Sequence, residues 1–298
     1  MSVIKNSVLS AAAATLLCMT AAANAGETVE RRVAADARGE VEIVNVSGEV
    51  QVLGWDRPEV QVHAELGSGV ERLDVESRDK RTYIKVVLPG RSSSGSSDLV
   101  VHVPRESTLS INTISADQTI GEVRGTQRLQ AVSGSIDTQV WGGELSVKTI
   151  SGDVTIAAHK QPAMTSVNTV SGDIRLDAAA GELALETVTG DMDIRMETLT
   201  RGRIRTTNGD VHLRTALAGD ARLDAESING DLRFNLRDPI DAQFEVETFN
   251  GEIDNCFGQK SVRTREFAPG NELRFKQGTG AARVRIKTLN GGVEICRE

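Results

Sequence analysis

The chain has 298 residues, a formal net charge of −8 and only 3% aromatic residues. Acidic and basic residues are interspersed along it, and no basic patch is interleaved with aromatic side chains, which argues against nucleic acid as a partner. The length suffices for one large or two small domains, and the frequent Gly, Thr, Val and Ile residues indicate a core of small, repeated β layers.

Residues 1–25 have the pattern of a secretory signal peptide. Lys5 precedes the apolar run VLSAAAATLLCM, the segment ends at AAANA, and cleavage is predicted after Ala25. The run is short for a membrane anchor, and Leu17 stands where a lipid-attachment signal at Cys18 would need a small residue. We therefore expect an exported bacterial protein, periplasmic or at the cell surface, with no transmembrane span in the mature chain.

Residues 26–110 contain strand-like runs without a regular repeat, among them VEIVNV, EVQVLGW, RTYIKVVL and DLVVHVP. A stack of repeats needs atypical ends that cover its terminal apolar layers. We therefore expect this segment to form an irregular β cap at the N-terminal end of a repeat domain.

From residue 111 onward the chain repeats a six-letter unit, of which TVSGDI at 169–174 is one copy. The glycines of successive copies are 18 to 21 residues apart, except for a final step of 40. These glycines are Gly134, Gly152, Gly172, Gly190, Gly209, Gly230, Gly251 and Gly291. Ala116 takes this position in a degenerate copy and Gly48 in an outlying one. Repeats of about 20 residues are typical of solenoids, in which each repeat is one coil.

Aligned on the glycine, the copies keep one kind of residue at each position. The second and fourth residues after the glycine and the fifth before it are apolar, as Val154, Ile156 and Val147 illustrate. Most copies have Thr or Ser three residues before the glycine. The period of two within each half predicts strands with one buried face, and the change of parity between the halves predicts a bend near the Thr. Stacked Thr, Ser and Asn side chains are expected to hydrogen-bond along the stack.

An antiparallel hairpin meander is the alternative to stacked coils. Four copies contain Asn-Gly, a strong hairpin signal, whereas most contain Ser-Gly or Thr-Gly. A column of like residues is what stacked coils produce, because counterparts lie about 4.8 Å apart. We therefore predict an all-β protein: a β-solenoid or β-helix-like stack of about 20-residue coils in residues 111–298, with the irregular β cap in residues 26–110.

Cys256 and Cys296 each follow a repeat glycine by five residues and so occupy the same column. A full coil between them would separate their Cα atoms by about 9.6 Å, which is too far for a disulfide. If residues 257–285 leave the stack as a hairpin, with NELRF and ARVRIKT flanking QGTG, the two coils are neighbours and the separation falls to about 4.8 Å. We predict the disulfide and the hairpin together.

The acidic residues that follow the repeat glycines are the most prominent candidate site. They are Asp153, Asp173, Asp191, Asp210 and Asp231, with Glu252. Such a column could hold cations or form the acidic groove of a β-helical polysaccharide lyase. An Asp beside a Gly in a turn also ties down local backbone N–H groups, and each coil needs this once. We therefore expect the column to be structural.

No motif for catalysis, metal binding or cofactor binding is found in the sequence. The histidines are His63, His102, His159 and His212, and no two of them have metal-ligand spacing. Cys-x-x-Cys, G-x-S-x-G and P-loop patterns do not occur. Basic residues at alternate strand positions are expected to neutralise the acidic column on adjacent coils. They are Arg201, Arg203, Arg205, Arg283, Arg285 and Lys287.

The signal sequence, the VHVP strand at 101–104 and the serial T-[VI]-[ST]-G-D repeats resemble the putative-adhesin β-strand-repeat family of bacterial envelope proteins, a domain of unknown function. The resemblance covers essentially the whole mature chain. It implies a β-helix-like, exported, non-enzymatic protein, and it supplies no catalytic motif.

The predicted function is that of a non-enzymatic envelope scaffold with adhesin-like binding. Its partners would be cell-surface or cell-wall polymers, such as an envelope polysaccharide, or other proteins. The alternative is a β-helical carbohydrate-active enzyme, a lyase or a hydrolase, which needs acids from several coils and a base gathered in one cleft. The sequence spreads its charges evenly instead.

Overall fold

The computed structural model describes residues 26–90, 95–159, 161–264 and 269–298. The signal peptide predicted in residues 1–25 lies outside these ranges. Every regular element in the described ranges is a β-strand, so the all-β prediction is confirmed. The strands are β1 (Glu27–Ala34), β2 (Glu40–Trp55), β3 (Glu59–Leu66), β4 (Arg72–Arg78), β5 (Arg81–Val87), β6 (Ser97–Pro104), β7 (Thr108–Gly121), β8 (Gln127–Ser133), β9 (Ile136–Val140), β10 (Gly143–Ser151), β11 (Val154–Ala158), β12 (Pro162–Asn168), β13 (Ile174–Thr189), β14 (Met192–Asn208), β15 (Val211–Asn229), β16 (Leu232–Arg237), β17 (Ala242–Asn250), β18 (Ile253–Asn255), β19 (Val262–Arg263), β20 (Asn271–Gln277), β21 (Ala282–Asn290) and β22 (Val293–Arg297).

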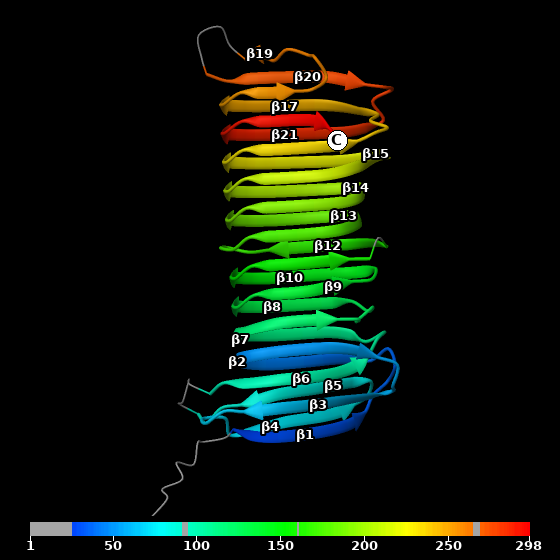
Figure 1. Cartoon of the computed structure of the whole chain (residues 1–298), viewed down its shortest axis with the longest axis vertical. Helices are drawn as coiled ribbons and strands as arrows, with labels where there is room; N and C mark the ends of the chain where they lie inside the picture. The colour runs from blue at the N-terminus through cyan, green and yellow to red at the C-terminus, as the bar shows by residue number, and fades with distance from the viewer. Residues whose placement is uncertain (1–25, 91–94, 160, 265–268) are drawn as a thin grey trace, which may run out of the picture.

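Most strands stack in parallel, one turn of the chain on the next, along the long axis of the molecule (Figure 1). In one row, β8, β10 and β12 pair so that Val147 lies in register between Leu129 and Val167. In a second row, β9 and β11 pair in the same way, with Ile136 opposite Val154. Each of these turns therefore gives one strand to each row. Parallel pairing rules out the antiparallel meander for these repeats.

The core is filled by the apolar positions that the repeat alignment predicts. Val147, Val154 and Ile156 are each at most 1% exposed. Phe234 and Phe244 are fully buried in the C-terminal coils, where the sequence predicts a bulkier core. Burying one such side chain contributes about 1.5–3 kcal/mol, so the repeated layers supply the main favourable term in folding.

The chain changes direction at the repeat glycine. Gly172 has a φ angle of +137°, a conformation that residues with a side chain rarely adopt. A Cβ atom at this position would lie 2.2 Å from the carbonyl oxygen of Gly152 in the preceding coil. The bend expected near the Thr is therefore located at the glycine, because only glycine lets successive coils approach this closely.

The Thr three residues before the glycine is buried and bonds within its own turn. Thr169 is 5% exposed, and its hydroxyl donates to the carbonyl oxygen of Ser171 at 3.3 Å. Thr149 and Thr187 make the equivalent contacts in their own turns. At these positions the expected Thr-to-Thr hydrogen bonds along the stack are replaced by local bonds, because the buried hydroxyl lies closest to its own main chain.

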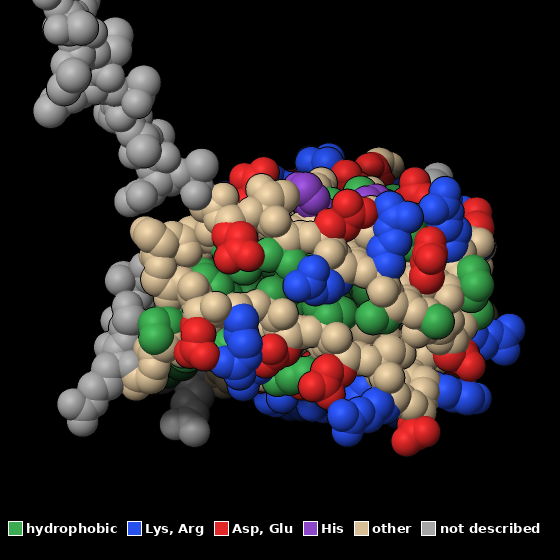
Figure 2. Space-filling view, turned by 90° about the horizontal axis from the view of Figure 1, so that it is seen from below, with side chains coloured by type: hydrophobic (Ala, Val, Ile, Leu, Met, Phe, Trp, Pro, Cys, Tyr) green, Lys and Arg blue, Asp and Glu red, His purple; other side chains and the backbone are tan. Residues whose placement is uncertain are grey.

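Strand β2 forms a complete coil at the N-terminal end of the repeats. Gly48 is in register with Ala116 of β7, so the outlying copy of the motif joins the stack directly. Residues 26–110 are therefore not irregular throughout. Beyond β2, antiparallel pairs β1–β3, β3–β6 and β4–β5 extend the sheet. Figure 2 looks onto this end, where acidic, basic and apolar side chains are mixed.

The last coil in the sequence is not the last coil in the stack. Strand β21 pairs in parallel with β15 on one edge and with β17 on the other, and β22 lies between β16 and β18 (Figure 1). The Asn side chains before the glycines follow this order. Asn290 donates to Asn229 at 2.8 Å, and Asn250 donates to Asn290 at 2.9 Å.

The segments NELRF and ARVRIKT do form strands, but they do not form the predicted hairpin. Strand β20 pairs antiparallel with β17 on the edge opposite β21. Residues 282–285 consequently belong to the stack. The physical reason is register: parallel insertion places Thr288 and Asn290 in the columns of Thr and Asn that the neighbouring coils supply.

The turn between β20 and β21 is tied to Asp241. The hydroxyl of Thr279 donates to its carboxylate at 2.7 Å, and the N–H of Gly280 donates at 2.5 Å. These hydrogen bonds, that of Thr279 first, hold the pKa of Asp241 below its usual value. These contacts fix the position of the turn from which β21 enters the stack.

Candidate functional site

The acidic column links each coil to the next. The carboxylate of Asp191 accepts a hydrogen bond from the N–H of Asp210 at 2.8 Å, and Asp210 accepts one from Asp231 at 2.8 Å. Asp153 and Asp173 accept from the next coil in the same way. The turn role expected from the sequence was local, whereas these carboxylates bind the following turn, because parallel stacking places its N–H groups directly above them.

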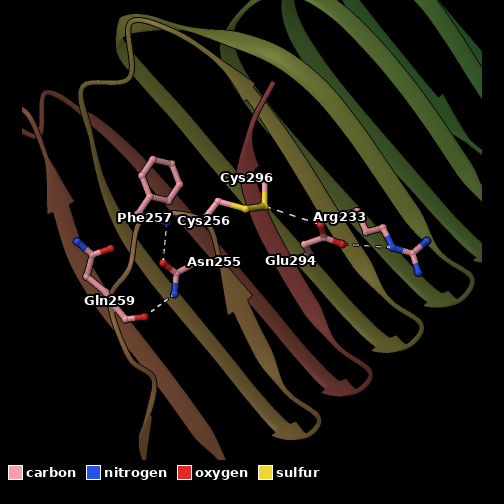
Figure 3. Close-up of a disulfide and its surroundings, with 7 residues drawn as sticks. All are labelled: Arg233, Asn255, Cys256, Phe257, Gln259, Glu294 and Cys296. Atoms are coloured by element: carbon pink, nitrogen blue, oxygen red, sulfur yellow. Dashed lines mark hydrogen bonds and ion pairs between the residues drawn. A yellow bond between two sulfur atoms is a disulfide. The ribbon is translucent and has the colours of Figure 1, made fainter.

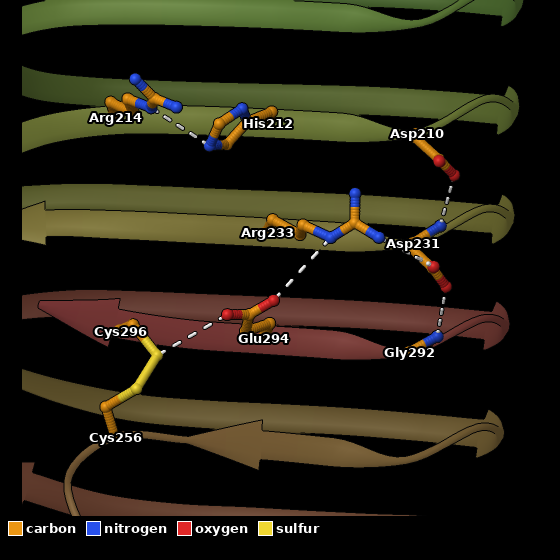
Figure 4. Close-up of polar contacts among 9 residues, drawn as sticks. All are labelled: Asp210, His212, Arg214, Asp231, Arg233, Cys256, Gly292, Glu294 and Cys296. Carbon is orange, nitrogen blue, oxygen red and sulfur yellow. Dashed lines mark hydrogen bonds and ion pairs between the residues drawn. A yellow bond between two sulfur atoms is a disulfide. The ribbon is translucent and has the colours of Figure 1, made fainter. Parts of the chain in front are cut away.

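The column ends at the inserted coil. Asp231 accepts a hydrogen bond from the N–H of Gly292 at 2.8 Å, and Figure 4 shows Asp210, Asp231 and Gly292 joined in this series. Glycine stands at 292, where the five coils before it in the stack have Asp, so the series of aspartates ends at Asp231.

Replacing Asp210 by Ala is expected to lower the free energy of unfolding by about 1 kcal/mol, because the N–H of Asp231 then loses its partner. Asp210→Asn keeps an acceptor oxygen and is expected to retain most of the stability. Urea denaturation followed by circular dichroism measures both. Equal destabilisation by Ala and Asn would contradict the hydrogen-bond role and point to the charge.

In the described ranges, no group of three or more His, Cys, Asp or Glu side chains is placed to hold a metal ion. Two of the histidines lie instead beside the two tryptophans. The ring centroids of His102 and Trp55 are 5.0 Å apart, and the rings of His159 and Trp141 stack at 3.5 Å. His212 lies 3.3 Å from Arg214 (Figure 4).

Four of the six basic residues, Arg201, Arg205, Arg285 and Lys287, pair with acids on adjacent coils, although not with the acidic column after the glycines. Arg205 lies 3.2 Å from Glu226, and Lys287 lies 2.5 Å from Glu247. Arg201 pairs with Glu182 on the neighbouring strand. These partners stand on the same strand row as the basic residues, so charges are compensated between successive coils of that row.

The disulfide joins the inserted coil to its outer neighbour. Cys256 and Cys296 are bonded, and their Cα atoms are 4.8 Å apart, the spacing of adjacent coils (Figure 3). Beside the bond, the side-chain oxygen of Asn255 accepts a hydrogen bond from the N–H of Phe257 at 3.1 Å. The contact that the spacing argument requires is thus made, although by insertion of a coil and not by a hairpin.

A column of exposed aliphatic residues is the surface feature that the sequence reasoning missed. Its members stand two residues before the repeat glycine, or before Ala116, and are 43–53% exposed. They are Ile114, Val132, Ile150, Val170, Val188, Ile228, Leu289 and Phe249. The signal is present in the letters T-[VI]-[ST]-G, in which an aliphatic residue recurs two positions before the glycine. The column runs along the stack and is interrupted by Thr207.

The C-terminal part of this column borders a groove with a volume of about 780 Å³. One side of the groove is formed by Val188, Ile228, Leu289 and Phe249, and the other by charged residues four before the glycines. Those charged residues are Glu186, Arg205, Glu226, Lys287 and Glu247. The segment after residue 263 adds Thr264, Pro269, Gly270 and Asn271 to the lining.

Parallel stacking, an exposed aliphatic column and a groove beside it together define a β-repeat protein with an apolar strip on its surface. The chain belongs to the Toastrack DUF4097 family, whose model matches residues 59–295. The resemblance to a putative-adhesin domain of unknown function is thereby confirmed. No curated protein matches the sequence.

The chain is also similar to several solved structures. A putative adhesin from Bacteroides fragilis is 9% identical, with 90% of this chain and 96% of that chain covered and a TM-score of 0.40. A putative adhesin from Parabacteroides distasonis is 12% identical, with 91% and 98% covered and a TM-score of 0.37. A putative lipid binding protein from the same species is 12% identical, with 91% and 97% covered and a TM-score of 0.29.

Within the described part of the chain, no helix has the length and apolar character that crossing a membrane requires.

Proposed function

We propose that the protein is an exported, non-enzymatic β-solenoid scaffold of the bacterial envelope that binds cell-surface or cell-wall polymers or partner proteins. The exposed aliphatic column is the observation that carries this proposal. Soluble proteins rarely expose a row of large apolar side chains along several coils unless it meets a partner. Repetition at one position in eight coils makes the column suited to an elongated ligand.

The proposal assigns a role to each part of the chain. Residues 1–25 act as the signal peptide, residues 26–110 cap the repeats apart from the coil of β2, and residues 111–298 form the remaining coils. Export to the periplasm or cell surface is supported by the bonded pair Cys256–Cys296, since structural disulfides persist in oxidising compartments.

The alternative of a β-helical lyase or hydrolase is less well supported. The carboxylates of Asp173, Asp191 and Asp210 each accept a main-chain hydrogen bond from the next coil. Arg205 and Lys287 are paired with glutamates. Groups already engaged in this way are not gathered around one reactive position, whereas hydrolysis of a glycosidic bond uses two carboxyl groups facing across it.

Binding of residues 26–298 to purified peptidoglycan sacculi, lipopolysaccharide and a glycan array tests the proposal. Replacing both Ile150 and Val170 by Ser is expected to weaken binding roughly tenfold, since two half-exposed aliphatic side chains are lost from the column. The matched control replaces the exposed Asp137 and Arg175 by Ser, outside the column, and is expected to bind like the wild type.

Equal losses in the two double variants would show that the column is not the binding surface. Release of shortened glycans during the incubation, detected by mass spectrometry, would favour the enzyme instead.

A further inference from the structure

The groove beside β13, β14, β15, β21 and β17 has chemistry that is distinct from the rest of the surface. Its apolar side consists of Val188, Ile228, Leu289 and Phe249, each 44–47% exposed. These residues come from four coils, and Thr207 occupies the position between Val188 and Ile228. The groove therefore runs along the stack axis, across the strands.

The charged side of the groove has three acidic and two basic residues, and so a formal net charge of −1. In stack order it reads Glu186, Arg205, Glu226, Lys287 and Glu247, so that signs alternate from coil to coil. Arg205 is paired with Glu226 at 3.2 Å, and Lys287 with Glu247 at 2.5 Å. Because the cations are already paired, a ligand on this side would contact the aliphatic parts of these side chains and not an unpaired cation.

The main chain beneath the groove is already paired. Strand β14 is bonded in register to β13 and β15, and β21 is bonded to β15 and β17. An extended peptide bound by strand addition needs a free sheet edge, which these inner strands do not have. Among the lining residues that the structure describes, Phe249 is the one aromatic side chain, so these residues form no row of aromatic rings for stacking sugars.

We propose that this groove binds a single hydrocarbon chain, the acyl chain of a fatty acid. Such a chain requires no hydrogen bonds and gains free energy from contact with aliphatic side chains. From the coil of Val188 to that of Phe249 there are four steps of about 4.8 Å, or roughly 19 Å, which an extended palmitoyl chain can span. Thr264, Pro269 and Asn271 line the groove near Phe249, where they would contact the end of the acyl chain.

This inference rests on the proposed binding role of the aliphatic column and names a ligand for its C-terminal part. The carboxylate of the fatty acid remains in solvent at the end of the groove formed by Val188. The aliphatic residues further along the stack, such as Ile150, then serve other contacts.

Titration with cis-parinaric acid, a fatty acid that becomes fluorescent in an apolar site, tests the proposal on residues 26–298. Saturable binding of one probe per chain is expected, with displacement by palmitic acid and its methyl ester but not by hexanoic acid. Ile228→Asp is expected to weaken binding at least tenfold. Met164→Asp, at a similarly exposed apolar position outside both the column and the groove, is the matched control and is expected to leave binding unchanged.

Thr207→Val fills the interruption in the apolar side and is expected to tighten binding about threefold, since it adds apolar contact at a partly exposed position. This gain supports the proposal even if Ile228→Asp proves poorly folded.

The absence of saturable binding, or equal losses in Ile228→Asp and Met164→Asp, overturns the proposal. If the probe does not bind while sacculi or lipopolysaccharide still do, the acyl-chain proposal fails and the scaffold function stands. If none of these ligands binds, both fail.

Discussion

Gly209→Ala is expected to lower the free energy of unfolding by about 3 kcal/mol or more. Gly209 has a φ angle of +147°, and a Cβ atom there would lie 2.0 Å from the carbonyl oxygen of Gly190 in the preceding coil. Backbone strain of this kind costs about 1–3 kcal/mol, and the clash is with main chain that cannot move without displacing a whole coil. Chemical denaturation followed by circular dichroism measures the loss.

Gly219→Ala is the matched control for this substitution. Gly219 lies in the same strand, β15, as the residues that follow Gly209, and a Cβ atom at 219 would meet no atom within 4 Å. Its variant is expected to lie within about 0.5 kcal/mol of the wild type. If both variants were equally stable, close approach of the coils at the glycine would not be the reason for its recurrence.

The repeat architecture could be predicted because, in a stack of coils, each position of the repeat has the same neighbours in every coil. The same residue type therefore recurs there. A Cβ atom at any of the eight repeat glycines from Gly134 to Gly291 would clash with the main chain of the neighbouring coil. The buried positions, such as Val154 and Ile174, recur for the same reason. The contact between Cys256 and Cys296 follows from membership of one column together with the geometry of a disulfide.

The order of the last coils could not be predicted in this way. A column shows that Asn290 belongs to the stack, but Asn290 fits equally well above Asn229 or beyond Asn250. The structure places it between them. The 40-residue step between Gly251 and Gly291 allows both arrangements, and the sequence contains no signal that separates a hairpin from an inserted coil.

The candidate site was only partly accessible from the sequence. The acidic column was found, but its hydrogen bonds to the next coil depend on the parallel register, as the contact from Asp210 to the N–H of Asp231 shows. The aliphatic column is part of the same motif. Alternation alone places Ile150 and Val170 on the solvent side, however, and does not indicate a binding role for them. The groove depends on Pro269 and Asn271, which reach it from beyond the repeats.

Removing the disulfide is expected to lower the free energy of unfolding by about 4 kcal/mol, which is the loop-closure value for a bridge spanning 40 residues. The position of the bridge adds to its importance. Cys296 lies in the inserted coil and Cys256 in the outer coil, so the bond holds the last-synthesised coil against a neighbour that precedes it in sequence. Without it, the coil of β21 and β22 is held only by its strand pairing and core contacts.

Urea denaturation of the oxidised protein, the reduced protein and the Cys256→Ser, Cys296→Ser double variant measures this effect. The reduced protein and the double variant are expected to unfold at the same urea concentration, well below that of the oxidised protein. A reducing agent should leave the double variant unchanged, which controls for effects of the reagent itself. Equal stability of the oxidised and reduced forms would mean that the flanking parallel ladders alone fix the inserted coil, since β21 is paired along both of its edges.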